Sequence, residues 1–175
     1  MSDAASSPAV GVICWGKPPS ANKPPSASGK AFLLNLQAAY RAEGGPRFTG
    51  LLYGRVYWFI AGYQPALHPD ADNLSKKIWD ALGLQGIAFA DDAQVRLRTA
   101  AVVDVLPAED GLAATELLIS AMPGKVAEAL DALLDGPPAA ATGLGPGFAY
   151  VECGPLEAGM LWYAVAAAEG REPPT

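Results

Sequence analysis

The chain has 175 residues, a hydrophobic fraction of 51% and a formal net charge of −6. This length allows one domain that buries roughly two thirds of its unfolded surface, and the hydrophobic fraction excludes general disorder. No apolar run approaches the roughly 18 residues of a membrane span, and two cysteines with one histidine favour neither a zinc site nor a disulfide scaffold, so a cytoplasmic protein without membrane contact is expected.

The negative charge is concentrated in the second half of the chain. Residues 1–98 contain ten Lys and Arg against seven Asp and Glu, which gives +3. Residues 99–175 contain two against eleven, which gives −9. Because phosphate contacts need positive charge, the first part of the chain remains compatible with a nucleic-acid-binding surface.

The N-terminal quarter is predicted to hold a tail, a strand, a loop and a helix. Residues 1–9, rich in Ser, Ala and Pro, are predicted to be a disordered tail, and the apolar residues 10–15 a buried strand. Residues 17–25 contain four prolines, which exclude a helix or a central strand and indicate a stiff loop. An amphipathic helix is expected over residues 31–43, ended by the glycine pair that follows.

The middle of the chain is predicted to supply most of the sheet. Residues 50–60 alternate with both faces mostly apolar, which indicates a central strand covered by a helix. Three further strands are predicted, over residues 87–89, 94–105 and 115–122, the last two paired through a turn. Arg96 and Arg98 share one face of their strand, where they either contact phosphate or face solvent.

Acidic residues gather around the helix predicted between these strands. Asp70 and Asp72 lie at its start, Lys76 lies one turn into it, and Asp91-Asp92 follow after its end. Hard oxygen ligands from several elements, beside a cation, are what a hydrolytic Mg²⁺ site requires.

Each of these residues also has a purely structural explanation. Asp70 or Asp72 would cap the helix, and the later acidic pair would form a turn between two strands. Asp72, Lys76 and Asp80, spaced by four, would form an exposed salt-bridge ladder worth a few tenths of a kcal/mol. The combination favours a ligand set, because one helix needs one cap and adjacent like charges repel unless a cation lies between them.

The C-terminal part differs in character. Residues 123–175 carry two basic and seven acidic side chains, which gives −5. A helix over residues 123–134 and strands over 148–152 and 160–166 are predicted, in an acidic extension packed on the core. Such an extension would cover a sheet edge, extend a dimer interface or shield a positive surface. The predicted class is therefore α+β: a mixed β-sheet packed against two main helices, with an extra C-terminal helix and strands.

Three separated blocks of sequence together resemble the RusA family of Holliday-junction resolvases. They are Pro-Pro-Ser-Ala-Asn-Lys at residues 18–23, the Asp, Asn and Lys pattern at residues 70–82, and Asp-Asp-Ala-Gln-Val at residues 91–95. The resemblance spans about residues 10–122 and implies that they form the nuclease core.

The resemblance implies a Mg²⁺-dependent endodeoxyribonuclease that acts as a homodimer and resolves four-way junctions by paired symmetric nicks in DNA recombination and repair. It implies that Asp70, Asp72 and Asp92 bind the metal, with Asp91 as a neighbouring candidate, Lys76 as a catalytic cation and Mn²⁺ as a substitute metal. Contacts to DNA are expected from Lys17, Asn22, Lys23, Asn73, Lys77, Arg96 and Arg98.

Two other classes of function are compatible with the sequence. One is a non-catalytic branched-DNA-binding module in which metal bound by the carboxylates only adds stability. The other is an interaction protein whose acidic C-terminal part imitates or excludes DNA. The nuclease interpretation is favoured because neither alternative explains the order of Asp, Asn, Lys and paired Asp.

Overall fold

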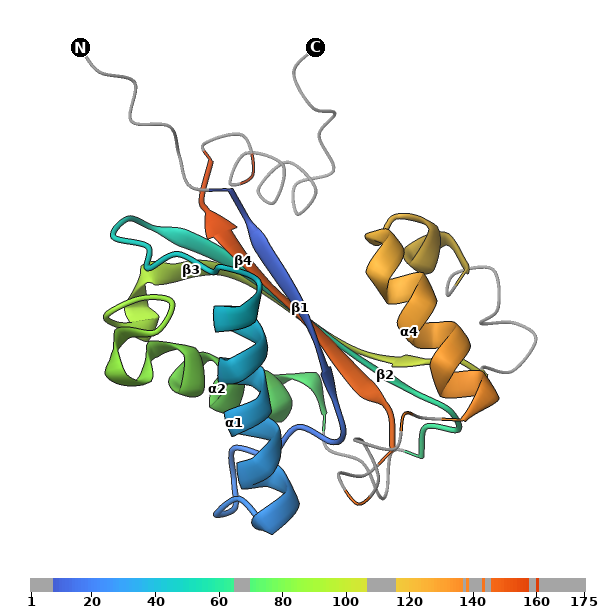
Figure 1. Cartoon of the computed structure of the whole chain (residues 1–175). Helices are drawn as coiled ribbons and strands as arrows, with labels where there is room; N and C mark the ends of the chain where they lie inside the picture. Colours follow the sequence, from blue (N-terminus) through green and yellow to red (C-terminus); the bar gives the residue numbers. More distant parts are fainter. Residues whose placement is uncertain are drawn as a thin grey trace.

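A four-stranded mixed sheet with strand order β1-β4-β2-β3 forms the centre of the computed structural model (Figure 1). The structure describes residues 8–64, 70–106, 116–136, 138, 143, 146–157 and 160. The strands are β1 (Val10–Trp15), β2 (Leu52–Ile60), β3 (Val95–Asp104) and β4 (Phe148–Pro155). The helices are α1 (Ala27–Ala42), α2 (Ala71–Gly83) and α4 (Gly124–Asp135), with short 3₁₀ turns η1 (Leu84–Gly86) and η2 (Asp92–Gln94).

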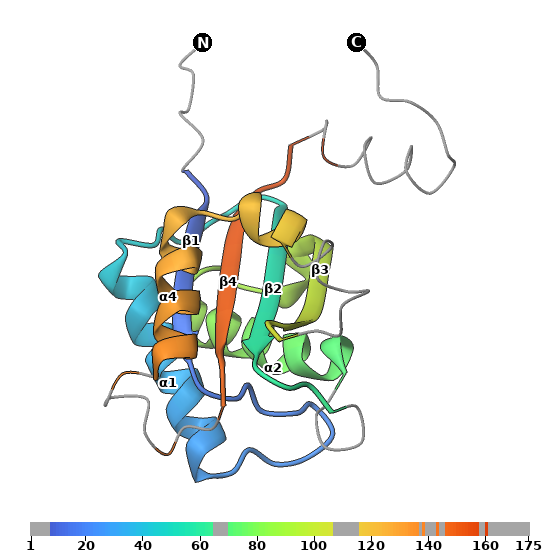
Figure 2. The ribbon, with the colours of Figure 1, turned by 90° about the vertical axis from the view of Figure 1, so that its right-hand side faces the viewer.

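The helices cover the sheet from both sides. Helices α1 and α2 lie against one face and α4 lies across the other, as Figures 1 and 2 show from two directions. Trp58 on β2 belongs to the larger core on the α1 and α2 side, whereas Phe59 belongs to a second core with Phe148 and Leu130 on the α4 side. Successive side chains of a strand point to opposite faces, so β2 is buried on both, as its sequence predicts. The predicted α+β class is confirmed.

Helix α2 connects two parallel neighbouring strands. Strand β2 pairs in parallel with β3, with Leu52 opposite Val95 and Ile60 opposite Asp104. Helix α2 packs closely on β2, because Gly54 has no side chain and a Cβ there would lie 2.5 Å from the ring of Trp79. A connection between two parallel strands must return the chain to the end of the sheet at which the first strand begins. The residues that precede β3 therefore follow the C-terminal end of α2.

The C-terminal part of the chain supplies an interior strand. Strand β4 pairs antiparallel with β1 on one side and with β2 on the other. Its side chains are among the most buried of the protein: Phe148, Ala149, Tyr150 and Val151 are at most 2% exposed. The strand predicted over residues 148–152 thus lies inside the sheet. The predicted tail over residues 1–9 and strand over residues 160–166 fall mostly outside the described residues.

Three local predictions are wrong. Residues 116–120 are helical, because Leu118 and Ile119 pack on the core under α4, and they form no hairpin with β3. Residues 87–89 form no strand, although Ala88 and Phe89 are fully buried. The acidic pair at residues 91 and 92 therefore begins a 3₁₀ turn before β3 and does not lie in a hairpin. Within the described parts of the chain, no helix is both long and apolar enough to cross a bilayer.

Candidate functional site

The start of α2 carries two carboxylates that differ in their hydrogen-bond partners. Asp70 is the N-cap, and its side chain accepts a hydrogen bond from the backbone N–H of Asn73 at 3.1 Å. Asp72 lies exposed in the first turn, where only its backbone oxygen is engaged, by the hydroxyl of Ser75 at 3.2 Å. The Asp72 carboxylate has no hydrogen-bond or ion-pair partner among the described residues. It therefore stands free to bind a ligand, in the positive field of a helix N-terminus.

The proline-rich loop lies beside the same end of α2. The backbone N–H of Ala21 donates to the backbone oxygen of Asn73 at 2.8 Å. The loop and the start of α1 form a pocket of about 240 Å³ whose polar lining includes Lys17, Lys23 and Ser20. Asn22, at the turn of the loop, is exposed. The structure therefore joins the first two blocks of the resemblance through this backbone hydrogen bond, and the loop that carries the two lysines lies against the start of α2.

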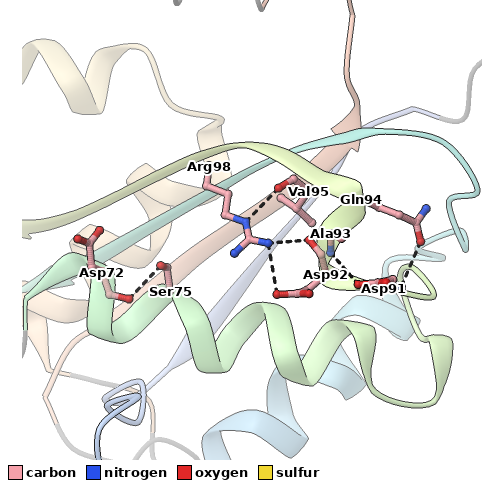
Figure 3. Close-up of polar contacts among 8 residues, drawn as sticks. All are labelled: Asp72, Ser75, Asp91, Asp92, Ala93, Gln94, Val95 and Arg98. Atoms are coloured by element: carbon pink, nitrogen blue, oxygen red, sulfur yellow. Dashed lines mark hydrogen bonds and ion pairs between the residues drawn. The ribbon is translucent and has the colours of Figure 1, made fainter.

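The turn before β3 is held by side chains. Asp91 is the N-cap of η2 and accepts from the backbone N–H of Ala93 at 2.8 Å (Figure 3). The side-chain oxygen of Gln94 accepts from the backbone N–H groups of Ala90 and Asp91 at 2.9 and 3.2 Å, which completes a capping box. The side-chain nitrogen of Gln94 donates to the oxygen of Gly50 at 2.9 Å and so ties the turn to the start of β2.

Asp92 has a different environment from Asp91. One nitrogen of the Arg98 guanidinium, Nη2, donates to the backbone oxygen of Asp92 at 2.6 Å and lies 3.4 Å from carboxylate oxygen Oδ2. A second nitrogen, Nε, donates to the oxygen of Val95 at 3.0 Å. The Asp92 side chain is 45% exposed. Asp91 thus serves as a cap, whereas the Asp92 carboxylate has only one, exposed cationic partner among the described residues.

The two acidic groups lie toward opposite ends of α2. Asp70 and Asp72 begin the helix, and Asp91-Asp92 follow its end after η1; Figure 3 shows Asp72 well separated from Asp92 along the helix. A helix of 13 residues is about 20 Å long. Among the described residues, no three His, Cys, Asp or Glu side chains are close enough to hold a metal ion. The described part of a single chain therefore does not fit a bound Mg²⁺ by itself.

The basic residues predicted to contact DNA differ in their surroundings. Lys76 is exposed and forms no ion pair with Asp72 or Asp80, so the salt-bridge ladder is absent from this described helix. Lys77 lies on another side of α2, where it lines an apolar groove of about 450 Å³ between α1 and α2. Arg96 is exposed and has no polar partner among the described residues.

Sequence reasoning missed a polar cluster on the α4 side of the sheet. Glu152, whose side chain is 13% exposed, accepts hydrogen bonds from the hydroxyls of Tyr53 and Tyr150, and its Oε1 lies 3.4 Å from Arg55. Burial raises the pKa of both tyrosines, and their hydrogen bonds to Glu152 raise it further. Arg55 stands out in the sequence as the one charge in an apolar strand, but nothing local reveals that it lies opposite Glu152.

The two cysteines are excluded as nucleophiles. Cys14 and Cys153 are free and buried, and burial raises the pKa of each thiol to about 12. The thiolate is the reactive form, so both groups are inert at neutral pH. The polar, exposed groups at α2 and η2 remain the candidates for chemistry.

These observations define an α+β protein with an exposed acidic and basic site built around one helix. Residues 39–108 match the family model described as endodeoxyribonuclease RusA. The matched range contains β2, α2, η2 and β3, and so includes both acidic groups. The match spans 70 of the 175 residues and confirms the resemblance over this part of the chain. No curated protein matches the chain.

Proposed function

We propose that the protein is a Mg²⁺-dependent, structure-selective endodeoxyribonuclease that resolves Holliday junctions by paired symmetric nicks during DNA recombination and repair in the cytoplasm. The family match over both acidic groups supports this proposal. The observation that carries it is the free Asp72 carboxylate in the first turn of α2, together with the backbone hydrogen bond from Ala21 to Asn73 that joins the basic loop to the start of this helix. In this proposal an oxygen that could bind metal and a loop that could bind phosphate belong to the same end of α2.

Asp70, Asp72 and Asp92 are the proposed ligands and catalytic carboxylates. One carboxylate oxygen of Asp70 accepts the capping hydrogen bond and the other is available to a metal. Both carboxylate oxygens of Asp72 are available, and the Asp92 carboxylate pairs only with Arg98 among the described side chains. Asp91 is the weaker candidate, because its side chain caps η2. Carboxylates suit Mg²⁺, with Mn²⁺ as a substitute, and such an ion, when bound, would supply an activated water and stabilise charge on the attacked phosphate.

A homodimer would bring together proposed ligands that lie far apart within one chain. Strand β3 is at the edge of the described sheet, so its outer backbone groups face no described strand. Antiparallel pairing of two such edges about a twofold axis would bring the turn before β3 of one copy toward the later half of β3, and hence toward the start of α2, in the other. Each site would then combine Asp72 of one copy with Asp92 of its partner, and two sites would nick two strands symmetrically.

The DNA surface follows from the same arrangement. Lys17, Asn22 and Lys23 of the loop, with Asn73 of α2, form the proposed phosphate-binding rim, and Arg96 is an exposed donor on β3. Lys77, in the groove on another side of α2, is the proposed DNA-binding residue least well placed to act with this rim. Removing one side chain that binds phosphate should reduce the salt dependence of duplex binding by about 0.9 in the log–log slope.

Lys76→Ala is expected to lower the cleavage rate more than the affinity for DNA. The side chain is exposed one turn after Asp72 and forms no ion pair among the described residues. A cation aimed at developing negative charge contributes roughly 10²–10³-fold to the rate. Single-turnover cleavage and junction affinity in EDTA measure the two effects. An equal fall in both would show that Lys76 only anchors phosphate.

The proposed function is tested by incubating the purified protein with Mg²⁺ and end-labelled four-way junctions, flaps and linear duplex in parallel. Paired symmetric nicks confined to junctions are expected. Nicking of every substrate would indicate a less selective nuclease. Junction binding without nicking in either Mg²⁺ or Mn²⁺ would favour the non-catalytic binding module, an alternative consistent with the absence of three converging ligands in the described part of one chain.

A further inference from the structure

Arg98 makes more polar interactions with its own chain than any other arginine in the described structure. Its Nε donates to Val95, and its Nη2 donates to the backbone of Asp92 and pairs with the Asp92 carboxylate (Figure 3). The two carbonyl groups are three residues apart and belong to the turn that carries Asp92. One planar guanidinium therefore fixes both the turn and the carboxylate on it.

The fork geometry of arginine explains why this arrangement needs that side chain. A guanidinium holds its N–H donors in a rigid plane, so Nε and Nη2 reach two acceptors at once. Lysine carries the same charge at a single point on a flexible stem. Gln94 holds the other side of the same turn through Ala90, Asp91 and Gly50. The turn is thus held from both directions by side chains.

We propose that Arg98 is a positioning residue that orients the Asp92 carboxylate, and that it does not serve primarily as a phosphate contact. The inference rests on the proposed nuclease function and on Asp92 as a site residue. Arg96, two residues earlier on the same strand, is exposed and has no polar partner among the described residues, so it is the arginine available to DNA. The register of β3 with β2 shifts at Arg96, which has no paired residue, whereas Arg98 lies opposite Gly54, so the two side chains have different surroundings and different roles.

Substitutions at the two arginines separate these roles. Arg98→Gln is expected to lower single-turnover cleavage of a saturated four-way junction by roughly tenfold or more, with junction affinity in EDTA changed by less than about twofold. Arg98→Lys should restore only part of the rate, because it restores the charge without the fork. Arg96→Gln should show the opposite pattern: weaker junction binding, a weaker dependence of that binding on salt concentration, and a smaller loss of cleavage rate.

A structural measurement makes the test independent of activity. Amide hydrogen exchange at Ala93, Gln94 and Val95 should be faster in Arg98→Gln than in the wild type, and unchanged in Arg41→Gln, an exposed site on α1. Unchanged exchange, or a fall in affinity equal to that of Arg96→Gln with the rate intact, would overturn the proposal. A wild-type protein that nicks no DNA would instead overturn the proposed function, while the exchange data would still decide whether Arg98 orders the turn.

Discussion

Asp72→Asn is expected to abolish Mg²⁺-dependent nicking of four-way junctions and to leave junction binding nearly intact. The substitution keeps the shape of the side chain and removes its charge at the carboxylate that has no partner among the described residues. Loss of a residue that only supports a metal ligand costs about 10–100-fold, so loss of a ligand should cost at least about a hundredfold in rate. DNA affinity should hold or rise slightly, because one negative charge near phosphate is removed.

The stability of the variant should change little. Asp72 lies in the first turn of α2, where a negative charge favours the helix by about 0.3–1 kcal/mol. Thermal melting therefore distinguishes a catalytic loss from unfolding. Asp80→Asn is the matched control, because Asp80 is an exposed aspartate of the same helix on the groove between α1 and α2. Normal cleavage by Asp72→Asn in Mg²⁺ would contradict the assignment of this carboxylate to the site.

Local sequence patterns predicted the elements that bury one clear face. The apolar spacing that predicts a helix over residues 31–43 corresponds to α1, whose Phe32, Leu36 and Tyr40 are buried. The helix begins earlier, at Ala27, because Ser26 accepts from the backbone N–H of Gly29 and caps it. Capping geometry depends on one hydrogen bond, so the start of a helix is harder to predict than its presence.

The position of β4 could not be predicted from local sequence. The composition changes at residue 123, and this change suggests an extension added to a finished core. Pairing of β4 with β2 joins Val151 to Val56 and Glu152 to Arg55, nearly a hundred residues away in each case. No local pattern encodes a partner at that distance. The pairing of Arg55 with Glu152 was missed for the same reason.

The residue types of the candidate site were predictable, but the separation of the two acidic groups in one chain was not. Structural explanations hold for Asp70, which caps α2, and for Asp91, which caps η2. Asp72 and Asp92 are not N-caps, and the sequence alone did not distinguish these two residues from the two capping aspartates. The distance between the two acidic groups depends on how α2 crosses the sheet, because a parallel connection places the ends of the helix at different ends of its strands.

A chain truncated after Met122 is expected not to fold. It would lack α4 and β4, and among the described strands β1 pairs with β4 alone, so β1 would have no sheet partner. Strand β2 would keep β3 and lose its other neighbour. Phe148, Val151 and Tyr150 are each at most 2% exposed, and burying one large apolar side chain contributes about 1.5–3 kcal/mol. Losing several exceeds much of the roughly 5–15 kcal/mol that stabilises a domain.

Circular dichroism and thermal melting of the truncated chain test this expectation. The truncated chain should show no cooperative melting transition. Val151→Asp in the full chain makes the same test at one position, since it puts a charge between Val12 and Val56, and Glu157→Gln is its exposed control. A truncated chain that melts cooperatively and still nicks junctions would contradict the place of β4 in the sheet. It would also favour the interpretation of the acidic C-terminal part as a shield over a positive surface.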